Sequence, residues 1–480
     1  MSSTEAVAAP AKRQLIEEHS FDYVPVSERH GEPRSLFFVW FGASAHVLTV
    51  VTGAIAITLG LNFWWALVAI VVGNLVGAVF MAFHSAQGPQ LGLPQVIQSR
   101  AQFGYYGALL ILALVWAMYI AFAAFDILLA GQGFQGILGG NLTLWMVLMT
   151  AALLLLAVFG YDWIHLFMRY QTWAYVAIFA LVAVVLVVHG LPASALNHGG
   201  FNFSQLLLAI SVIAVFQISY APYVSDYSRY LAPEKAAGTF WSTYWGTSIV
   251  CIALMALGAA IATLAPTAQT LDTVKVIGGN TLGSVLVLVL AFGLLPPSAM
   301  NIYGGILSTV TIANNFVKFR STVPLRIAVG VGVSVISLLV ATAGSGNFMN
   351  SFENYLTALL YFLVPWTAIN LTDFYLIRRG KYRTADFFDA DGPFGRLAWR
   401  GLLVYLLTFA LEIPFMNTTV YQGPISKAMG GADIAWIVGL VFAIPVYYLL
   451  ARNQQPESPE VEEAGVPSQA KAAGGVNVLK

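Results

Sequence analysis

Residues 293–305, GLLPPSAMNIYGG, interrupt a long apolar segment of the chain. They include two adjacent prolines and three glycines, whereas SVLVLVLAF before them and ILSTVTIA after them are almost purely apolar. In a lipid bilayer every backbone N–H and C=O group needs a partner, so a broken helix is tolerated only where protein or a water-filled cavity surrounds it. We expect Pro296 and Pro297 to loosen the helix here, which predicts a site inside a membrane protein.

The composition indicates an integral membrane protein. Of the 480 residues, 59% are apolar and 9% are charged, whereas soluble domains are about 25% charged. The net charge of zero argues against a nucleic-acid partner, and the single cysteine excludes a disulfide framework or a cysteine metal cluster. The polar N-terminus lacks the short apolar core of a signal peptide, so we expect the first apolar segment to remain as a membrane span.

Twelve apolar segments are long enough to cross a bilayer, which takes about 20 helical residues. With the N-terminus inside, the inner segments hold 20 of the 22 Lys and Arg residues, and the outer loops hold only Lys275 and Lys427. This positive-inside pattern predicts a multi-pass protein of the plasma (inner) membrane with both termini cytoplasmic. The expected spans lie near 35–59, 62–84, 106–134, 143–160, 169–190, 204–224, 243–265, 282–314, 324–343, 355–377, 398–418 and 432–452.

Two further spans contain interruptions. The first holds VWFGASAHVLTVVTG (39–53), with Ser44 and His46 inside it, and the sixth holds AVFQISYAPYVSDYSRY (214–230), in which Pro222 removes a helical hydrogen bond. The first and sixth spans would occupy the same position in two successive groups of five spans. Broken helices at corresponding positions of two halves are typical of transporters built from inverted repeats, with the substrate site at the middle of the membrane.

Four motifs occur in order along the membrane part of the chain: ERHGEPRSLFFVWF (28–41), SRAQFGYYGA (99–108), YAPYVSDYSRYLAP (220–233) and NIYGG (301–305). Together they resemble the nucleobase–cation symporters, and more narrowly the purine–cytosine permease branch. The resemblance implies an all-α, LeuT-type fold of about twelve transmembrane helices, with two inverted five-helix repeats and two peripheral helices.

On this basis the chain has five parts. We expect a cytoplasmic tail, two inverted repeats, two peripheral helices and a disordered cytoplasmic tail, at 1–34, 35–190, 204–378, 398–452 and 453–480. The resemblance implies import of a nucleobase (cytosine and/or purines such as adenine, guanine or hypoxanthine) by cation symport through alternating access. We expect the protein to lie in a lipid bilayer. We expect no enzymatic activity, cofactor, bound metal, nucleic acid or obligate protein partner.

The third span carries the main candidate site. Tyr119, Phe122 and Asp126 recur every three to four residues, so they share one helix face. An acid in the middle of a span marks function by default. In the resembled family an aromatic residue of this span stacks on the base, and a polar residue four positions later binds its edge. These roles fall on Phe122 and Asp126, where the family more often has tryptophan and an amide.

Spans six and eight supply further candidates, because a flat base needs rings for stacking and polar groups at its edge. In span six, Phe216 or Tyr220 would complete the stack, and Gln217 is a candidate edge reader. In span eight, Ser298 and Asn301 share one face, and the resembled family has a substrate-contacting asparagine at the place of Asn301.

Four more polar residues have predicted roles. Ser44, in the first broken span, is a further substrate-binding candidate. Asp226 and Arg229, at the cytoplasmic end of span six, are predicted to form a structural pair or inner gate. Glu412 in span eleven lies outside the repeats and is expected to face a peripheral helix or an oligomer contact.

The co-transported ion is predicted from the eighth span. Sodium-coupled relatives bind Na⁺ between carbonyls of the broken first helix and hydroxyls in the first half of the eighth. The run before Ser298, VLVLVLAFGLLPP, contains no hydroxyl, which favours a proton, with Na⁺ as the alternative. A carboxyl removed from water holds its proton more tightly, so Asp126 and His46 are the proton-coupling candidates.

Three other functions stay open. A carrier of the same fold could take another neutral N-heterocycle, such as allantoin, hydantoin, uracil, pyridoxine or thiamine. Amino acids are disfavoured, because no Arg or Lys lies in mid-span to bind a carboxylate. A membrane enzyme would need a catalytic constellation, and the seven histidines are scattered without an HExxH pattern. A non-transporting receptor is distinguished only by a flux assay.

Overall fold

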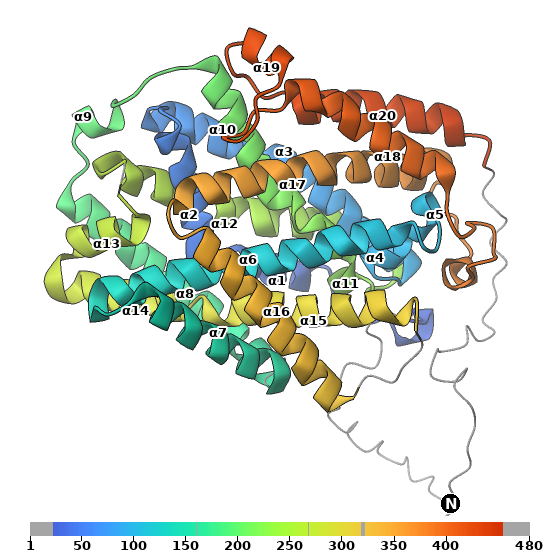
Figure 1. The fold of residues 1–480 in the computed structure, drawn as a ribbon, viewed down its shortest axis with the longest axis horizontal. Coiled ribbons are helices and arrows are strands. Elements are labelled where there is room, and N and C mark those ends of the chain that lie inside the picture. The colour runs from blue at the N-terminus through green and yellow to red at the C-terminus, as the bar shows by residue number, and fades with distance from the viewer. Residues whose placement is uncertain (1–22, 160, 267, 318–321, 455–480) are drawn as a thin grey trace, which may run out of the picture.

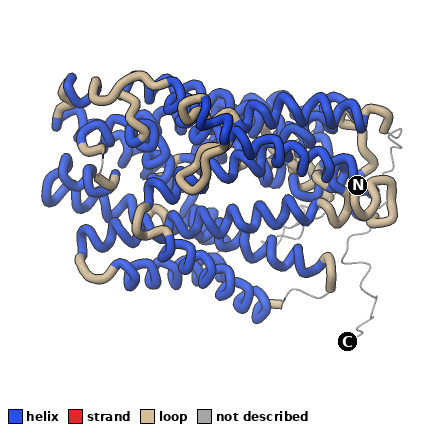
Figure 2. The backbone as a smooth tube through the Cα atoms, turned by 45° about the horizontal axis from the view of Figure 1, so that its top comes forward, coloured by secondary structure: helices blue, strands red, loops and turns tan. Residues whose placement is uncertain are grey.

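The computed structural model describes residues 23–159, 161–266, 268–317 and 322–454. Figure 2 shows this part of the chain as helices and loops throughout. The long helices are α1 (Arg34–Ser44), α2 (Val47–Thr58), α3 (Phe63–Leu91), α6 (Ala108–Leu138), α7 (Leu142–Phe159), α8 (Tyr161–His189), α10 (Phe203–Ile218), α12 (Ala236–Leu264), α14 (Ser284–Phe292), α15 (Leu295–Asn314), α16 (Val323–Ala343), α17 (Phe348–Leu371), α18 (Trp399–Glu412) and α20 (Ala435–Ala451). Short helices connect them: α4 (Gln95–Gln98), α5 (Arg100–Phe103), α9 (Ala193–Leu196), α11 (Ser225–Ser228), α13 (Thr270–Gly278) and α19 (Pro424–Ala428).

Every predicted span coincides with a helix or a pair of helices. Among the described residues, seven helical segments, and the bent pair α1 and α2 as an eighth, are long and apolar enough to cross a membrane. α7, α8 and α20 contribute shorter apolar stretches, and α18, with 14 residues, lies at the remaining predicted span. The prediction of an all-α, multi-pass membrane protein is confirmed. The predicted tails at 1–22 and 455–480 lie outside the described residues.

Helices α1, α2, α3, α10 and α12 pack on one another and are called the bundle body. Glycines lie at its crossings. A Cβ atom on Gly77 of α3 would collide with the backbone of Ala214 of α10, and one on Gly258 of α12 would collide with the backbone of Val50 of α2. Since lipid gives no hydrophobic drive between helices, such close contacts between small residues hold the bundle body together.

Helices α6, α7, α15 and α16 form a second group, called the scaffold body. Two glycines of α15 allow close approach of its neighbours: a Cβ on Gly304 would lie 2.7 Å from the Tyr119 ring of α6, and one on Gly305 would lie 2.9 Å from Val333 of α16. α17 lies against α10 of the bundle body and α6 of the scaffold body, and on its other side it contacts α18 and α20.

The first two predicted breaks, in spans one and six, lie where the sequence places them. α1 and α2 meet at Ala45 and His46 with a bend of 65°. α10 ends at Ile218, and a short turn containing Pro222 leads to α11. Both breaks belong to the bundle body and lie on its side toward the scaffold body, where the cavity described below is found.

The third break lies at the start of the predicted stretch, at Gly293 and Leu294. α15 begins at Leu295, and Pro296 and Pro297 occupy its first turn, where the missing N–H groups would have no helical acceptor. The helix is thus interrupted directly before these prolines, which lack the N–H groups that would bond to the carbonyls of Phe292 and Gly293. Gly293 also allows close packing, because a Cβ atom there would overlap the hydroxyl of Tyr175 on α8.

Both ends of the described chain lie at the same end of the molecule, called the tail end. Near the start, the Val24 N–H donates to the Gly92 carbonyl after α3 (2.9 Å). At the other terminus, Arg378 Nη2 donates to Gln454 Oε1 (3.3 Å). In Figure 1 this end, with α5 and the end of α20, is on the right, and α9 and α13 mark the opposite end. A chain that crosses the membrane an even number of times has both ends on the same side, so this arrangement agrees with the twelve predicted spans.

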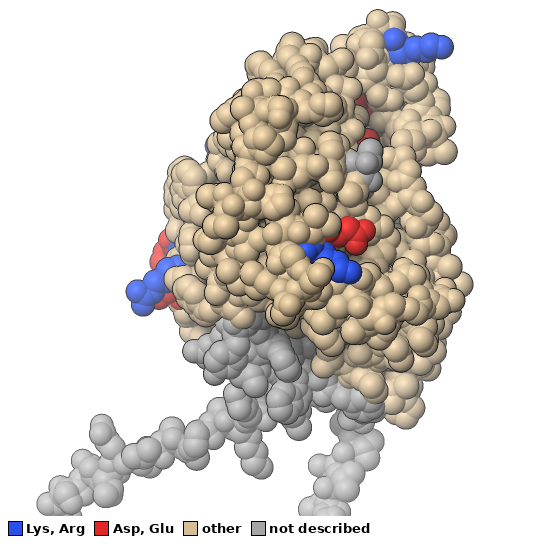
Figure 3. All heavy atoms as spheres, turned by 90° about the vertical axis from the view of Figure 1, so that its left-hand side faces the viewer, with Lys and Arg blue, Asp and Glu red and all other residues tan. Residues whose placement is uncertain are grey.

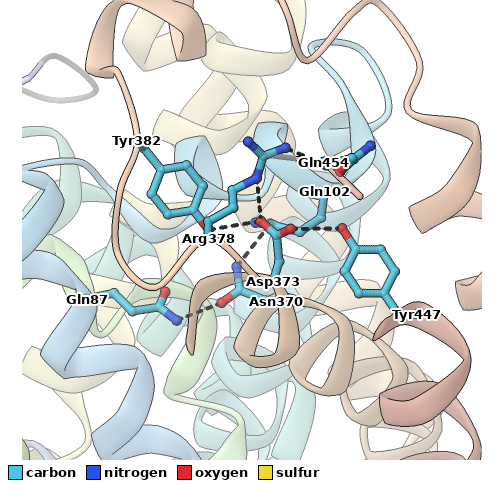
Figure 4. A network of polar contacts seen from close by, with 8 residues as sticks. All are labelled: Gln87, Gln102, Asn370, Asp373, Arg378, Tyr382, Tyr447 and Gln454. Atoms are coloured by element: carbon cyan, nitrogen blue, oxygen red, sulfur yellow. Dashed lines mark hydrogen bonds and ion pairs between the residues drawn. The ribbon is translucent and has the colours of Figure 1, made fainter. Parts of the chain in front are cut away.

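A buried polar network joins separate parts of the chain at the tail end (Figure 4). The carboxylate of Asp373, which follows α17, accepts hydrogen bonds from Gln102 Nε2 (2.8 Å), the Tyr382 hydroxyl (2.9 Å) and the Tyr447 hydroxyl (3.2 Å). Arg378 Nε lies 3.3 Å from the same carboxylate. One buried charge with four partners thus connects α5, α17 and α20, the condition under which a buried ion pair is tolerated.

Replacing Gly293 with alanine should destabilise the protein by about 1–3 kcal/mol, because α8 has to move to make room for the methyl group. Thermal unfolding of the purified protein in detergent should show a lower midpoint than the wild type. Gly332→Ala in α16 is the control, because a Cβ there would meet nothing within 4 Å. Equal midpoints for the two variants would show that Gly293 is not required at the break.

Candidate functional site

A cavity of about 320 Å³ lies between the bundle body and the scaffold body, beside the two broken helices. The bundle body contributes Trp40, His46, Tyr220, Tyr223, Asp226, Tyr227 and Arg229 to its wall. The scaffold body contributes Tyr119, Phe122, Asp126, Met300, Asn301 and Tyr303. The wall therefore combines many aromatic rings with a few polar groups, as small-molecule sites do.

Asp126 is the acid of the scaffold wall and is 2% exposed. Its Oδ2 atom accepts a hydrogen bond from the Ser298 hydroxyl (2.7 Å). The side chain of Asn301, one turn further along α15, also approaches this carboxyl. The Oδ1 atom has no hydrogen-bond partner among the described residues. A buried acid with an unused oxygen beside a cavity can take a proton or accept a hydrogen bond from a ligand N–H group.

His46 belongs to the bundle wall, because it occupies the N-cap position of α2 at the first break. Its Nδ1 atom has no hydrogen-bond partner in the described structure. Behind it lies Phe216, whose ring centroid is 6.2 Å from that of His46 and whose side chain is 1% exposed. Of the two aromatic candidates in the sixth span, Tyr220 lines the cavity and Phe216 supports the wall from behind.

Phe122 lines the scaffold wall and is covered by a ring from α17. The Tyr355 ring meets it edge to face, with centroids 5.3 Å apart. The Tyr355 hydroxyl donates to the Met118 carbonyl (3.1 Å), which fixes this part of α17 to α6. α17 is therefore the helix that closes the aromatic side of the cavity.

Gln217 and Ser44 lie inside the bundle body rather than on the cavity wall. Gln217 Nε2 donates to Asn74 Oδ1 (2.7 Å), and Gln217 Oε1 accepts from the Thr247 hydroxyl (2.5 Å). The Ser44 hydroxyl lies 3.2 Å from that of Thr247. These contacts join α1, α3, α10 and α12. Both ends of the Gln217 amide are thus hydrogen-bonded inside the bundle body.

Asp226 and Arg229 both line the cavity, at its tail-end side. Asp226 Oδ1 accepts a hydrogen bond from the backbone N–H of Gln95 (3.0 Å), the first residue of α4. The Arg229 guanidinium lies 5.0 Å from the centroid of the Tyr230 ring, and the residue is 1% exposed. The hydrogen bond from Gln95 connects the end of the sixth span to the α3–α6 connection.

A chain of amide side chains continues from there to the Asp373 network. Gln95 Nε2 donates to Gln87 Oε1 (3.0 Å), Gln87 Nε2 to Asn370 Oδ1 (2.9 Å), and Asn370 Nδ2 to Gln102 Oε1 (3.1 Å). Figure 4 shows the last part of this chain, with Gln102 bonded in turn to Asp373. The cavity wall and the tail-end network thus form one connected polar system.

Several residues of the wall were not predicted. Trp40 lines the cavity, and its buried Nε1–H has no hydrogen-bond partner in the described structure, so it is an available donor. Tyr223 and Tyr227 line the cavity next to Tyr220. Their spacing of three and four residues was visible in the sequence. An aromatic stripe at such spacing is usually helix packing, so it did not distinguish a site.

The fold and the cavity define a transporter class: two packed bodies with broken helices facing a central site. Residues 23–439 match the sequence profile of the family described as "Permease for cytosine/purines, uracil, thiamine, allantoin". The chain belongs to this family, the nucleobase–cation symporters, and is a secondary transporter rather than an enzyme. The predicted family is confirmed.

Two relatives span nearly the whole chain. YxlA of Bacillus subtilis, a purine-cytosine permease homologue, is 42% identical over 444 residues, which cover 91% of this chain and 96% of that protein. The purine-cytosine permease FCY2 of Saccharomyces cerevisiae is 25% identical over 446 residues, which cover 86% of this chain and 81% of that protein.

Solved structures with the same fold include the transporter Mhp1. Its inward-facing form gives a TM-score of 0.75 at 19% identity, covering 92% of this chain and 95% of Mhp1. Its closed form with bromovinylhydantoin bound gives 0.71 at 18% identity, covering 92% and 96%. At these identities the likeness establishes the fold alone, and the predicted LeuT-type architecture is confirmed.

Replacing Gln217 with leucine should lower the thermal midpoint, because buried polar groups of Asn74 and Thr247 lose their partners, at about 1–3 kcal/mol each. Asn301→Ala is the matched comparison. It lines the cavity, so it should leave the midpoint near the wild-type value and raise the KM of uptake about tenfold. The reverse result, a raised KM and an unchanged midpoint for Gln217→Leu, would place Gln217 in the substrate site.

Proposed function

We propose that this protein imports a nucleobase, cytosine and/or a purine such as adenine, guanine or hypoxanthine, by symport with a proton. The observation that carries the proposal is the composition of the cavity. Asp126 and Asn301 on the scaffold wall face a bundle wall of aromatic rings. A base has aromatic faces and an edge of donors and acceptors, so it matches both walls.

The proposed binding mode places the base between rings of the two bodies. Phe122 from the scaffold body and Tyr220 from the bundle body would stack on its faces, a contact worth about 1–3 kcal/mol per base. Asp126 and the amide of Asn301 would bind its edge, since an amide offers two donors and one acceptor. Ser298 would hold the Asp126 carboxyl in place through its hydrogen bond.

The size and charge of the cavity support a small neutral cargo. Its volume of about 320 Å³ lies at the lower end of the range of about 300–1,000 Å³ for ligand sites, which favours a free base over a nucleoside. Among the described wall residues, Arg229 at the tail-end side is the only Lys or Arg. A carboxylate substrate would require a cation near Asp126 and Asn301.

The names of the relatives support the same cargo class, because both are purine-cytosine permeases or homologues. The hydantoin bound to Mhp1 supports the alternative, a carrier of another neutral N-heterocycle such as allantoin, hydantoin, uracil, pyridoxine or thiamine. Both classes of cargo would use the same stacking site. They differ in the hydrogen-bond donors and acceptors on the edge of the ring that Asp126 and Asn301 would recognise.

Alternating access follows from a cargo held between two bodies. A ligand that contacts both walls stabilises the conformations in which they close on it, and so shifts the equilibrium between open states. The cavity continues to Asp226 and Arg229 at the tail end, which we propose is the cytoplasmic side of the plasma (inner) membrane. The opposite end, seen in Figure 3, carries few charged side chains, in agreement with the positive-inside pattern.

A proton is the proposed coupling ion, with Na⁺ as the alternative. Sodium requires several oxygen ligands, and the run before Ser298, residues 285–297, offers no side-chain hydroxyl. The Ser298 hydroxyl itself donates to Asp126. Asp126, with its unused Oδ1, and His46, with its unpartnered Nδ1, are the groups that can exchange a proton with the cavity.

Uptake into proteoliposomes tests the function. Radiolabelled cytosine should accumulate when a proton gradient is imposed, and unlabelled adenine, guanine and hypoxanthine should inhibit its uptake. Allantoin, hydantoin and uracil serve as comparison competitors. Accumulation driven only by a sodium gradient would show that Na⁺ is the coupling ion. Absence of cytosine uptake, together with uptake of labelled allantoin or hydantoin, would show that the cargo is another N-heterocycle.

Replacing Asp126 with asparagine should abolish accumulation against a gradient and leave some exchange of external for internal substrate, because an amide keeps hydrogen-bonding groups but cannot carry the proton. Counterflow and gradient-driven uptake measured on the same proteoliposomes separate the two effects. Asp272→Asn, at an exposed position on α13, is the control. Wild-type accumulation and pH dependence in Asp126→Asn would rule out Asp126 as the coupling group.

A further inference from the structure

A second buried acid lies far from the cavity wall, at the end of α18. Glu412 is 0% exposed, and neither of its carboxyl oxygens has a hydrogen-bond partner in the described residues. The predicted contact with a peripheral helix is confirmed. A Cβ atom on Gly439 of α20 would overlap Glu412 Oε1 and would lie 3.4 Å from Val364 of α17. The carboxyl is therefore enclosed where α17, α18 and α20 meet.

Asp433, just before α20, is the nearest acid, and its charge acts on Glu412. Asp433 has three donors: the Tyr361 hydroxyl and the Asn417 N–H (2.8 Å) donate to Oδ2, and the Ala435 N–H donates to Oδ1 (3.0 Å). Of the two acids, only Asp433 has donors to stabilise a negative charge.

The groups facing Glu412 offer it no compensation. From α17 the neighbouring titratable group is Tyr361, whose hydroxyl donates to Asp433. From α18 it is Tyr405, whose hydroxyl donates to the Phe362 carbonyl (3.1 Å). Before α20 it is Asp433. No ion pair to Glu412 is found in the described part of the chain, and an unpaired carboxylate in such a place costs several kcal/mol.

We propose that Glu412 is a proton-binding site, occupied at neutral pH, and that its bound proton allows α17 to pack against α18 and α20. Release of the proton would leave a second negative charge beside Asp433 with no donor to stabilise it. The helices would have to separate to let water reach it. α17 also carries Tyr355, which covers Phe122 at the cavity. The proton on Glu412 therefore stabilises the helix that closes the aromatic side of the transport site.

Infrared difference spectroscopy tests the bound proton directly and does not depend on the cargo. The full-length wild type and Glu412→Gln are compared in lipid at neutral pH, in H₂O and D₂O. The wild type should show the C=O stretch of a protonated carboxylic acid that the variant lacks, and the band should shift on deuteration. Loss of a carboxylate band instead would overturn the proposal. Glu353→Gln, a half-buried carboxyl on α17, is the matched control and should leave the carboxylic acid band in place.

The pH dependence of stability gives a second test. A proton kept by folded Glu412 but released by the unfolded chain, where Glu titrates at about pH 4.3, makes stability fall as pH rises above that value. Relative to Glu412→Gln, the unfolding equilibrium constant of the wild type should therefore rise by up to about tenfold per pH unit between pH 5 and 8. The same pH dependence of the unfolding equilibrium constant in the wild type and in Glu412→Gln would overturn the proposal. Should the Gln variant fail to fold, Glu412→Leu provides the same uncharged reference.

Discussion

The architecture depends on one constraint, that no backbone polar group is left without a partner in hydrocarbon. Helices can stop inside the membrane only beside polar side chains or a cavity. The breaks at His46 and Pro222 satisfy this condition together, because both lie on the wall of the cavity between the two bodies. The same constraint that makes a broken helix costly therefore gathers the free polar groups at one place, where a substrate can use them.

Glycines determine how closely the helices approach, and they do so inside each body. The contacts at Gly77 and Gly258 join the bundle body, and those at Gly304 and Gly305 join the scaffold body. The Gln217 amide adds hydrogen bonds within the bundle body. Contacts of this kind within each body, and an aromatic cavity between them, favour movement of the bodies as units around a bound ligand.

The buried acids show three ways of holding a carboxyl group in this protein. Asp373 has four partners and acts as a structural ion at the tail end. Asp126 has one hydrogen bond and one free oxygen beside the cavity, which suits reversible proton exchange. Glu412 has no partner and is enclosed by three helices, which suits a retained proton. The number of donors around each carboxyl distinguishes these roles.

The amino-acid sequence was enough to predict the membrane class, the positions of the spans and the three breaks, because apolar length, proline and charge placement are local properties. Its four motifs indicated the family. Spacing along each helix also pointed to Asp126 in span three and Asn301 in span eight, and both line the cavity. The packing of the helices was needed to show that Gln217 is hydrogen-bonded within the bundle body and that Gly293 packs directly against Tyr175 of α8. Those outcomes depend on which side chain of a distant helix lies opposite, and no pattern within one span contains that information.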